Sequence, residues 1–328
     1  MPRSREYGIP GRDEPILLDV HSDHQTFRIP LIDLSKYRHA DSLSEKRKTA
    51  DEIVNGFKEV GFIYLEGHGI PSTTSAAFFS LSSSIKDKLA WEDPRANRGY
   101  VKIGRERVTQ SEDAAEIAEL PNQAPDMKET MEIGRDWDKT WRNHWPRESD
   151  VLGFKQTMLD FYQMFFEDKI NEQRHNLRLV SYPSIKTSLL MKEGQARAGA
   201  HSDYGTLALL FQDNVGGLEV ENPRTKRFQP ATPMPGTIVV NTGDLLARWS
   251  NDILRSTLHR VVAPPAESAA NTDGNGSGMT PLRQSIVFFC SPNGDARISC
   301  LPNCERPTKP PSAITTEEYI VGRLASTI

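Results

Sequence analysis

The first half of the chain alternates short apolar strands with amphipathic helices. The segment IPLIDLS (29–35) predicts a short strand, and residues 41–60 carry apolar side chains at helical spacing. The next segment, GFIYLEGHGIP (61–71), predicts a strand that a Gly-Ile-Pro turn closes. The remaining expectations for this half are a second amphipathic helix over 78–89, an irregular stretch over 92–150 and a third helix over 151–173.

From residue 177 the pattern changes to short apolar segments that Gly, Pro and Asn residues separate. These segments are LRLVSYP, TLALLFQ, GGLEV, RFQPA, GTIVVN, HRVV and RQSIVFF. Strands this short and evenly punctuated predict an antiparallel sandwich or barrel. The polar stretch AESAANTDGNGSGMT (266–280) predicts a surface loop, and residues 316–324 predict a closing helix. The sequence therefore predicts a mainly β protein with helices (α+β), in which a helical N-terminal half precedes a β core.

Composition and charge narrow the partners of this chain. Its 328 residues are 37% hydrophobic, enough to bury a globular core, and its net charge is −4. Because no basic block is longer than a few residues, we expect neither nucleic acid nor a membrane as partner. No apolar run is long enough to cross a bilayer, and no signal-peptide core follows the N-terminal arginines. Three cysteines, late and odd in number, favour a reducing compartment, so we expect a cytoplasmic protein.

A histidine and an aspartate lie two residues apart in AHSDYGTLALLFQD, ahead of an apolar run. In extended chain the side chains of His201 and Asp203 point to the same face, although an isolated His-x-Asp is usually a capped turn at a strand end. His259, in STLHRVV, supplies a second imidazole at the head of another predicted strand. Two imidazoles and a carboxylate on a β scaffold are typical of non-haem Fe(II) oxygenases, and zinc would accept the same donors.

An arginine and a serine lie two apart in PLRQSIVFF. The guanidinium of Arg283 beside the hydroxyl of Ser285 suits a carboxylate, which the fork can bind through two hydrogen bonds. An ordinary surface arginine on an edge strand is the alternative. Since the apolar residues that follow indicate an interior strand, we expect Arg283 to meet an anionic partner such as a dicarboxylate co-substrate.

Other potential metal ligands lack partners at a suitable spacing. Cys300 and Cys304 could form half of a zinc site, but no second pair of ligands follows them. His68 belongs to the EGHGIP turn and is expected to be structural. The histidines expected to face solvent are His21, His24, His39, His144 and His175.

With these residues in order, the chain resembles the Fe(II)- and 2-oxoglutarate-dependent dioxygenases of the isopenicillin N synthase-like superfamily. The similarity runs from residue 29 to about 324. The segments that carry it include DMKETMEIGRD (126–136), NHWP (143–146), HSDYGTLALLFQD (201–213) and NTGDLLARWSNDILRSTLHRVV (241–262). ANRGY, GQARAGAHSDYG and GDLLARWSND are most similar to the fungal branch with thymine 7-hydroxylase and the polyketide-pathway (tropolone/citrinin-type) oxygenases. The resemblance implies a double-stranded β-helix (jelly-roll) core.

The resemblance also implies a division of the chain. Its regions would be an irregular arm (1–28), a helical N-terminal region of the non-haem dioxygenase type (29–175), the dioxygenase β core (176–295) and a C-terminal tail with a helix (296–328). One segment departs from the family. Members usually carry a further helix and loop before the strand that starts near Leu177, and EDKINEQRHNLRLVSYP leaves little room for them.

By this resemblance, His201, Asp203 and His259 would ligate Fe(II). The co-substrate 2-oxoglutarate would chelate the ion, and Arg283 and Ser285 would hold its distal carboxylate. O2 would be the further reactant, and ascorbate would serve as the reductant in vitro. Succinate and carbon dioxide would be the products of the co-substrate.

Three aromatic residues have implied roles in ligand binding. Tyr182, in VSYP, matches a tyrosine whose hydroxyl often helps to hold the distal carboxylate, and plain strand packing is the alternative. Tyr204 follows the ligand Asp203, and Phe289 lies four residues after Ser285 on the same face of its strand. Matching positions in thymine 7-hydroxylase-like sequences are aromatic and sandwich a flat ring, which implies a planar substrate. Core aromatics without a ligand are the other interpretation.

The mouth of the site has two further candidates. The NRGY segment (97–100), which ends at Tyr100, and Arg197 are both expected to line it. Arg197 could equally pair with Glu219 or another surface carboxylate.

The leading hypothesis is therefore an Fe(II)- and 2-oxoglutarate-dependent dioxygenase that oxidises a small planar or aromatic molecule, in fungal secondary-metabolite biosynthesis. A thymine or pyrimidine hydroxylase is the alternative within the class. A catalytically degenerate binding protein with the same fold is the alternative from another class, and an iron enzyme that needs no 2-oxoglutarate is a third. We expect a monomer or a weak dimer.

Overall fold

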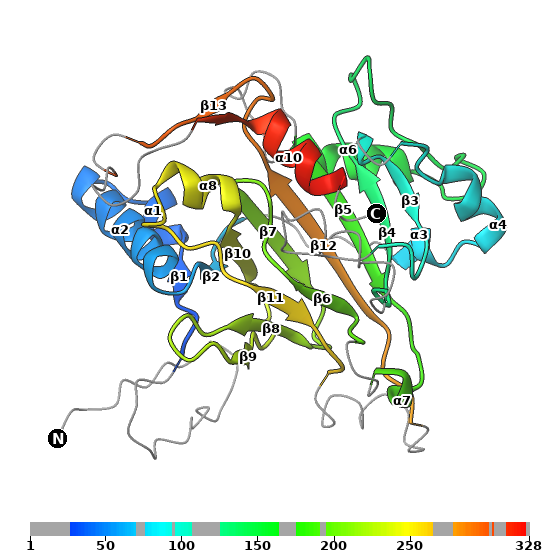
Figure 1. Cartoon of the computed structure of the whole chain (residues 1–328), viewed down its shortest axis with the longest axis horizontal. Coiled ribbons are helices and arrows are strands. Elements are labelled where there is room, and N and C mark those ends of the chain that lie inside the picture. The colour runs from blue at the N-terminus through cyan, green and yellow to red at the C-terminus, as the bar shows by residue number, and fades with distance from the viewer. Residues whose placement is uncertain are drawn as a thin grey trace.

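The computed structural model describes residues 27–69, 76–93, 96–106, 125–163, 175–190, 195–264, 278–301, 304 and 313–325. Two β-sheets form its core (Figure 1). The predicted arm (1–28) and surface loop (266–280) lie almost wholly outside the described residues, as does the departing segment between 164 and 174. The division at residues 29, 176 and 296 stays a prediction.

The larger sheet has eight strands in the order β1-β2-β10-β7-β12-β5-β4-β3. Its strands are β1 (Leu31–Asp33), β2 (Phe62–Glu66), β10 (Ile238–Thr242), β7 (Leu207–Gln212), β12 (Arg283–Cys290), β5 (Asn176–Tyr182), β4 (Glu129–Ile133) and β3 (Gly99–Val101). Strands β1 and β2 pair parallel, and the other neighbours pair antiparallel.

The smaller sheet has four strands in the order β6-β11-β8-β9. These are β6 (Ala198–His201), β11 (His259–Val261), β8 (Leu218–Glu221) and β9 (Phe228–Pro230). Apolar residues of both sheets, among them Val180, Val220 and Val239, share one buried cluster. The two sheets therefore pack face to face, as a jelly-roll core requires, and the expected fold class is confirmed.

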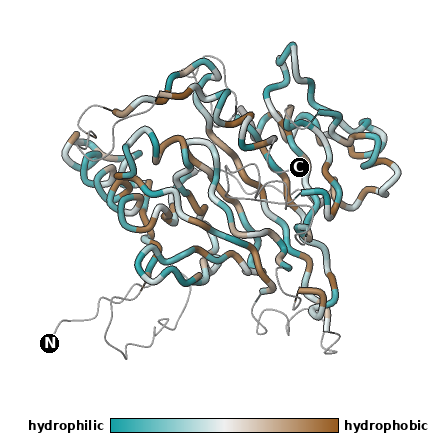
Figure 2. Tube along the Cα trace, viewed as in Figure 1, coloured by the Kyte–Doolittle hydropathy of each residue, from teal (hydrophilic) through white to brown (hydrophobic). Residues whose placement is uncertain are grey.

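The alternation of side chains along β5 shows how the layers form. Leu177 and Leu179 face a cluster that α3 (Ala76–Phe79) and α6 (Phe154–Gln163) cover, whereas Val180 and Tyr182 face the smaller sheet. The strand is therefore buried on both faces, although its first residues on the inner face, Asn176 and Arg178, are polar. Figure 2 shows hydrophobic stretches along the central strands.

The outer face at the other end of the large sheet is covered by α2 (Leu43–Glu59), which follows the short α1 (Ser35–Arg38) (Figure 1). Helix α2 begins at a capping box. The Ser42 side chain accepts from the N–H of Glu45, and the Glu45 carboxylate accepts from the N–H of Ser42. Phe57, on the buried face of α2, packs against Ile63 and Ile238.

Two expectations about the N-terminal half are wrong. The single helix over 78–89 is broken into α3, α4 (Ser83–Lys86) and a 3₁₀ turn, η1 (Asp87–Leu89), because Ser82 leaves helical conformation with ψ of 148°. The stretch 92–150 is not irregular throughout, since it contributes β3 and β4 to the large sheet.

The other elements complete the site. Helices α7 (Thr187–Leu190) and α8 (Asp244–Trp249) were not predicted. The predicted closing helix is present as α10 (Thr316–Ala325). It follows the antiparallel pair of β13 (Arg297–Ile298) and β14 (Ile314–Thr315). Within the described residues, no helix has the length and apolar character needed to cross a membrane.

Candidate active site

Three side chains converge where the smaller sheet ends. His201 closes β6 and His259 opens β11, and the two residues are paired in register across the strands. Asp203 follows β6 by two residues. One ligand atom from each of the three lies within 4.8 Å of the other two, and the imidazole centroids are 4.3 Å apart. The three residues that the spacing singled out are therefore brought together, within reach of a single ion.

Hydrogen bonds orient each of these side chains. The Nδ1 atom of His201 lies 2.7 Å from the carbonyl oxygen of Gly199, and Nδ1 of His259 lies 3.2 Å from that of Thr257. A carbonyl can only accept, so each Nδ1 donates to its carbonyl and Nε2 is the ring nitrogen left to bind a metal. The amide of Asn241 donates to Oδ2 of Asp203 at 2.6 Å, which leaves Oδ1 directed toward His259.

Burial sets the protonation state of His201. Burial and then the nearby His259 lower the pKa of His201 to about 3, although Asp203 acts in the opposite direction. The imidazole is therefore neutral at ordinary pH, which is the form that binds a metal. Two imidazoles and one carboxylate fit Fe(II), with coordination positions left over for other ligands.

Within the described part of the chain, these three residues form the one group of three or more side chains able to hold a metal. Cys300 and Cys304 are partly buried free thiols and belong to no such group. The alternative zinc site therefore gains no support.

Arg283 and Ser285 start β12 and are both buried. Arg283 donates to Oε1 of Gln212 at 3.2 Å, and its guanidinium lies 4.8 Å from the ring centroid of Tyr182. Its Nε has no hydrogen-bond partner among the described residues. Since no described carboxylate pairs with this buried cation, its surroundings suit a bound anion.

Arg197 lies beside this group and not at the mouth of the site. It is fully buried and donates to the carbonyls of Pro183 and Pro281 and to the hydroxyl of Thr280. Burial and the neighbouring Arg283 lower the pKa of Arg197 to about 10. The expected place at the mouth is therefore wrong.

The alternative pairing of Arg197 with Glu219 is wrong too. Glu219 accepts hydrogen bonds from Arg260 instead, at 2.8 Å.

A cavity of about 480 Å³ opens beside two of the three converging side chains, those of His201 and Asp203. His201, Asp203, Tyr204 and Phe289 line it, so both expected clamp aromatics lie in its wall. Tyr100 does not line it. Tyr100 is buried in the core and donates to the Glu129 carboxylate at 2.7 Å. The same carboxylate also pairs with the buried Lys86.

Strand geometry separates the two ends of the site. Arg283 pairs with Tyr182 at one end of the β12–β5 ladder, and Phe289 pairs with Asn176 at the other. Six residues at about 3.3 Å each place Arg283 and Phe289 about 20 Å apart along the strand. The anion end and the cavity end therefore lie at opposite ends of the same ladder.

A charged network that the sequence did not reveal forms part of the cavity wall. Arg178 pairs with Glu132 at 2.6 Å and with Glu106 at 3.4 Å, and Lys128 pairs with Glu106 at 3.0 Å. Burial alone would raise the pKa of Glu106, but Arg178 and Lys128 outweigh it and lower the value to about 2. Arg178, Glu106 and Lys128 line the cavity, and Arg178 also lies 5.6 Å from the Phe289 ring centroid.

His175 corrects another expectation. It is 2% exposed rather than solvent-facing, and its Nδ1 accepts the N–H of Ser291 at 3.0 Å. His144 is also partly buried, against the carbonyls of Leu89 and Ala90.

Comparisons with known proteins agree with this geometry. The family model of the 2OG-Fe(II) oxygenase superfamily matches residues 173–292. A second family model, described as "non-haem dioxygenase in morphine synthesis N-terminal", matches residues 29–148. The 2-oxoglutarate-Fe(II) type oxidoreductase ppzD of Metarhizium majus is 32% identical over 84% of this chain and 87% of its own length. The proline hydroxylase buaE of Petromyces alliaceus is 30% identical over 90% of this chain and all of its own.

Solved structures give the same result. The crystal structure of full-length thymine 7-hydroxylase from Neurospora crassa, in complex with alpha-KG, superposes with a TM-score of 0.78 at 39% identity, over 93% of this chain and 98% of that one. Another structure of the same protein, with alpha-KG and thymine, gives the same TM-score.

Proposed function

Since the chain belongs to the 2OG-Fe(II) oxygenase superfamily and is a 2-oxoglutarate-dependent non-haem iron dioxygenase, we propose that it oxidises a C–H bond of a small planar or aromatic molecule in secondary metabolism. The observation that carries the proposal is the presence of Tyr204 and Phe289 in one cavity wall with His201 and Asp203. The fungal relatives ppzD and buaE support the wider setting.

We assign the metal to His201, Asp203 and His259. Fe(II), with 2-oxoglutarate and O2, supplies the oxidising chemistry when bound. The chain holds the three donors in place through Gly199, Thr257 and Asn241, so that little reorganisation is needed on binding. Asp203 and His259 are buried, so they would keep water from their side of a bound ion.

We assign the distal carboxylate of 2-oxoglutarate to Arg283 and Ser285. The orphan Nε of Arg283 and the Ser285 hydroxyl, 3.5 Å from Nη1, are donors that a carboxylate would satisfy. The ring of Tyr182 lies against two guanidiniums, those of Arg283 and Arg197, at 4.8 and 5.9 Å. Tyr182 therefore supports the anion site by packing whether or not its hydroxyl reaches the ligand.

In the cavity, we assign the planar part of the substrate to the space between Tyr204 and Phe289. Each ring lies against a guanidinium, that of Arg323 at 4.8 Å from Tyr204 and that of Arg178 at 5.6 Å from Phe289. These contacts fix the rings before the substrate arrives, so less side-chain entropy is lost on binding.

A pyrimidine hydroxylase is the second candidate, because the thymine 7-hydroxylase structure with thymine superposes on this chain over 93% of its length. Both candidates share the site residues and differ in what fills the cavity.

The test is substrate-dependent succinate release from Fe(II), ascorbate and 2-oxoglutarate, with thymine on one side and a panel of resorcylic aldehydes on the other. Release with an aldehyde supports the proposal, and release with thymine alone supports the second candidate. His201→Ala is the control that should abolish turnover and the weak visible band of the anaerobic Fe(II)–2-oxoglutarate complex. No succinate with any substrate would favour a degenerate binding protein instead.

A further inference from the structure

We propose that the cavity has a second, outer subsite, which holds an apolar or aromatic extension of the substrate away from the planar end. The outer subsite is defined by Trp91, Trp141 and the face of α10 that carries Ile320, Val321 and Leu324. This inference rests on the proposed function and names the substrate class more closely. It predicts a molecule larger than a free pyrimidine or a single phenol ring.

The size of the cavity is the first support. At about 480 Å³, it falls within the range of about 300–1,000 Å³ that is typical of sites for drug-sized ligands. Neither Arg283 nor Ser285 is among its lining residues, so this space is additional to the distal-carboxylate site. A single ring between Tyr204 and Phe289 would fill only part of it.

The outer wall has a large apolar part, beside the polar lining residues Arg135, Asp138, Thr140, Thr316 and Glu317. Ile320, Val321 and Leu324 lie at positions i, i+1 and i+4 of α10, which puts them on one side of the helix. All three line the cavity and are partly exposed, as are Trp91 and Trp141. Large apolar side chains that line a cavity in this way are typical of ligand contacts.

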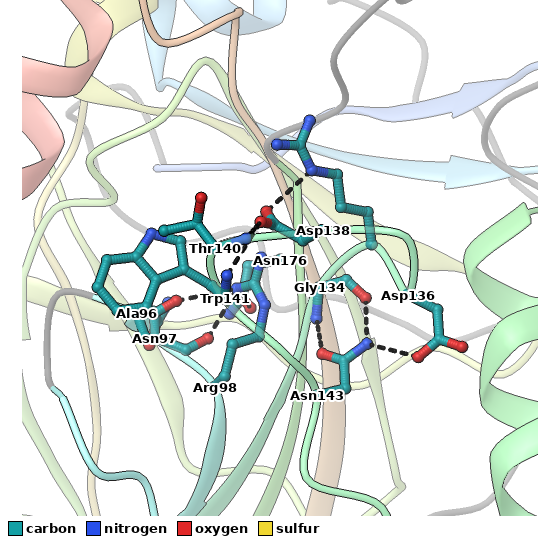
Figure 3. Close-up of polar contacts among 11 residues, drawn as sticks. Ala96, Asn97, Arg98, Gly134, Asp136, Asp138, Thr140, Trp141, Asn143 and Asn176 are labelled. Atoms are coloured by element: carbon teal, nitrogen blue, oxygen red, sulfur yellow. Dashed lines mark hydrogen bonds and ion pairs between the residues drawn. The ribbon is translucent and has the colours of Figure 1, made fainter.

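The loop that carries Trp141 is held in place by hydrogen bonds from its own polar side chains (Figure 3). Asp138 accepts the N–H groups of Thr140 and Trp141 at 2.9 and 3.0 Å. The amide of Asn143 bonds both the N–H and the carbonyl of Gly134, at 2.8 and 2.7 Å. These bonds hold the backbone at Trp141, which lowers the ordering cost of a contact with its ring.

The same loop is joined to the segment before β3. The guanidinium of Arg98 lies directly over Gly134 and donates to the carbonyls of Ala96 and Asn97 and to the side chain of Asn176. Asn176 is paired with Phe289, so the frame of the outer subsite begins where the planar-ring site ends. One continuous wall therefore leads from the proposed clamp to Trp141.

The experiment measures binding by calorimetry to the full chain, anaerobic and loaded with Fe(II) and 2-oxoglutarate. Two probe pairs are used, 2,4-dihydroxybenzaldehyde with its phenyl-substituted derivative, and thymine with N1-benzylthymine. In the wild type the extended member of at least one pair should bind about tenfold or more tightly than its single-ring partner, because it buries a further apolar ring.

Trp141→Ala should remove this gain and leave the affinity for the single ring unchanged, and Trp141→Phe should keep most of it. Trp137→Ala is the matched control. Trp137 lies in the same loop but is 57% exposed and does not line the cavity, so both affinities should be unchanged. Thermal unfolding of each variant confirms that it is folded.

Equal affinity for both members of each pair, or a gain that survives in Trp141→Ala, would overturn the outer subsite while the planar-substrate proposal stands. If no probe binds, the planar-substrate proposal fails and the outer subsite falls with it. Succinate release with a single-ring probe, without tighter binding of its extended partner, would likewise reject the outer subsite and keep the planar-substrate proposal.

Discussion

The carboxylate of Asp126 accepts the backbone N–H of Gly199 at 2.8 Å, across 73 residues of sequence. The carbonyl of Gly199 in turn accepts the Nδ1–H of His201 at 2.7 Å. Asp126 is itself paired with the buried Lys128 at 2.6 Å. A charged group in the cavity wall is thus connected through Asp126 to the orientation of a proposed metal ligand.

Asp126→Ala should therefore weaken Fe(II) binding by about tenfold or more, since the partners that orient ligands typically contribute about 10–100-fold in metal affinity. The measurement is an anaerobic titration with Fe(II), repeated with Co(II) for its visible absorption. Asp126→Asn is the matched control. It loses the charge that pairs with Lys128 but keeps an oxygen that can accept from Gly199, so its metal affinity should stay near that of the wild type. Equal weakening in both variants would show that the ion pair, and not the hydrogen bond, matters.

Arg283→Ala should raise the KM for 2-oxoglutarate by about 30-fold or more, because the loss of one partner of a buried charge pair costs about 2–5 kcal/mol. The KM of Arg283→Lys for 2-oxoglutarate should fall between those of the wild type and Arg283→Ala, since lysine keeps the charge without the planar fork. Initial rates at varied 2-oxoglutarate give the constants. Arg260→Ala, which removes a partly exposed ion pair with Glu219, should leave that KM nearly unchanged. An unchanged KM in a folded Arg283→Ala protein would reject the carboxylate assignment.

The strands of the core were predictable because each buries at least one face. LRLVSYP and RQSIVFF became β5 and β12, which pair over seven residues. The strands β3 and β4 were not predictable, because Glu129 and Glu132 break the apolar pattern of ETMEI. Their carboxylates are buried only because Lys86 and Arg178, distant in sequence, pair with them. Such long-range compensation leaves no local signal.

The candidate site also contains residues that could be predicted from the sequence and residues that could not. His201, Asp203 and His259 have a recognisable spacing on strands, and the structure brings them together. Arg178 was not singled out, since no hydroxyl follows it two residues on, as Ser285 follows Arg283. The fold turns it into the cavity, where Glu106 and Glu132 meet it. A search for opposite charges on neighbouring predicted strands would have been the available signal.

His175 should make the protein less stable in mild acid. Burial lowers its pKa to about 4, below the value of about 6.5 expected for the unfolded chain. Between these values the unfolded chain binds a proton that the folded chain does not, so the free energy of unfolding falls as the pH falls from about 6.5 to about 4. Protonation would also turn Nδ1 from the acceptor of the Ser291 N–H into a donor. The loss should be roughly 2–3 kcal/mol over this window.

Denaturant unfolding at a series of pH values measures this slope. His175→Asn should flatten it, because the amide oxygen can accept from Ser291 and does not titrate. His39→Asn, at an exposed position, should leave the slope as in the wild type. Identical slopes for the wild type and His175→Asn would show that other groups cause the acid sensitivity.

Gly134→Ala should destabilise the protein because a Cβ at this position would overlap the guanidinium of Arg98. Arg98 would have to leave the carbonyl of Asn97, 2.8 Å away, and we expect a loss of about 1–3 kcal/mol, as for other overpacked sites. In an Arg98→Ala background the same substitution should cost only a few tenths of a kcal/mol, so a double-mutant cycle of denaturant midpoints isolates the contact. Gly322→Ala, with open space around its Cβ in α10, should instead stabilise by up to about 1 kcal/mol. A cost for Gly134→Ala that is independent of Arg98 would mean that the loop tolerates no side chain at this position for another reason.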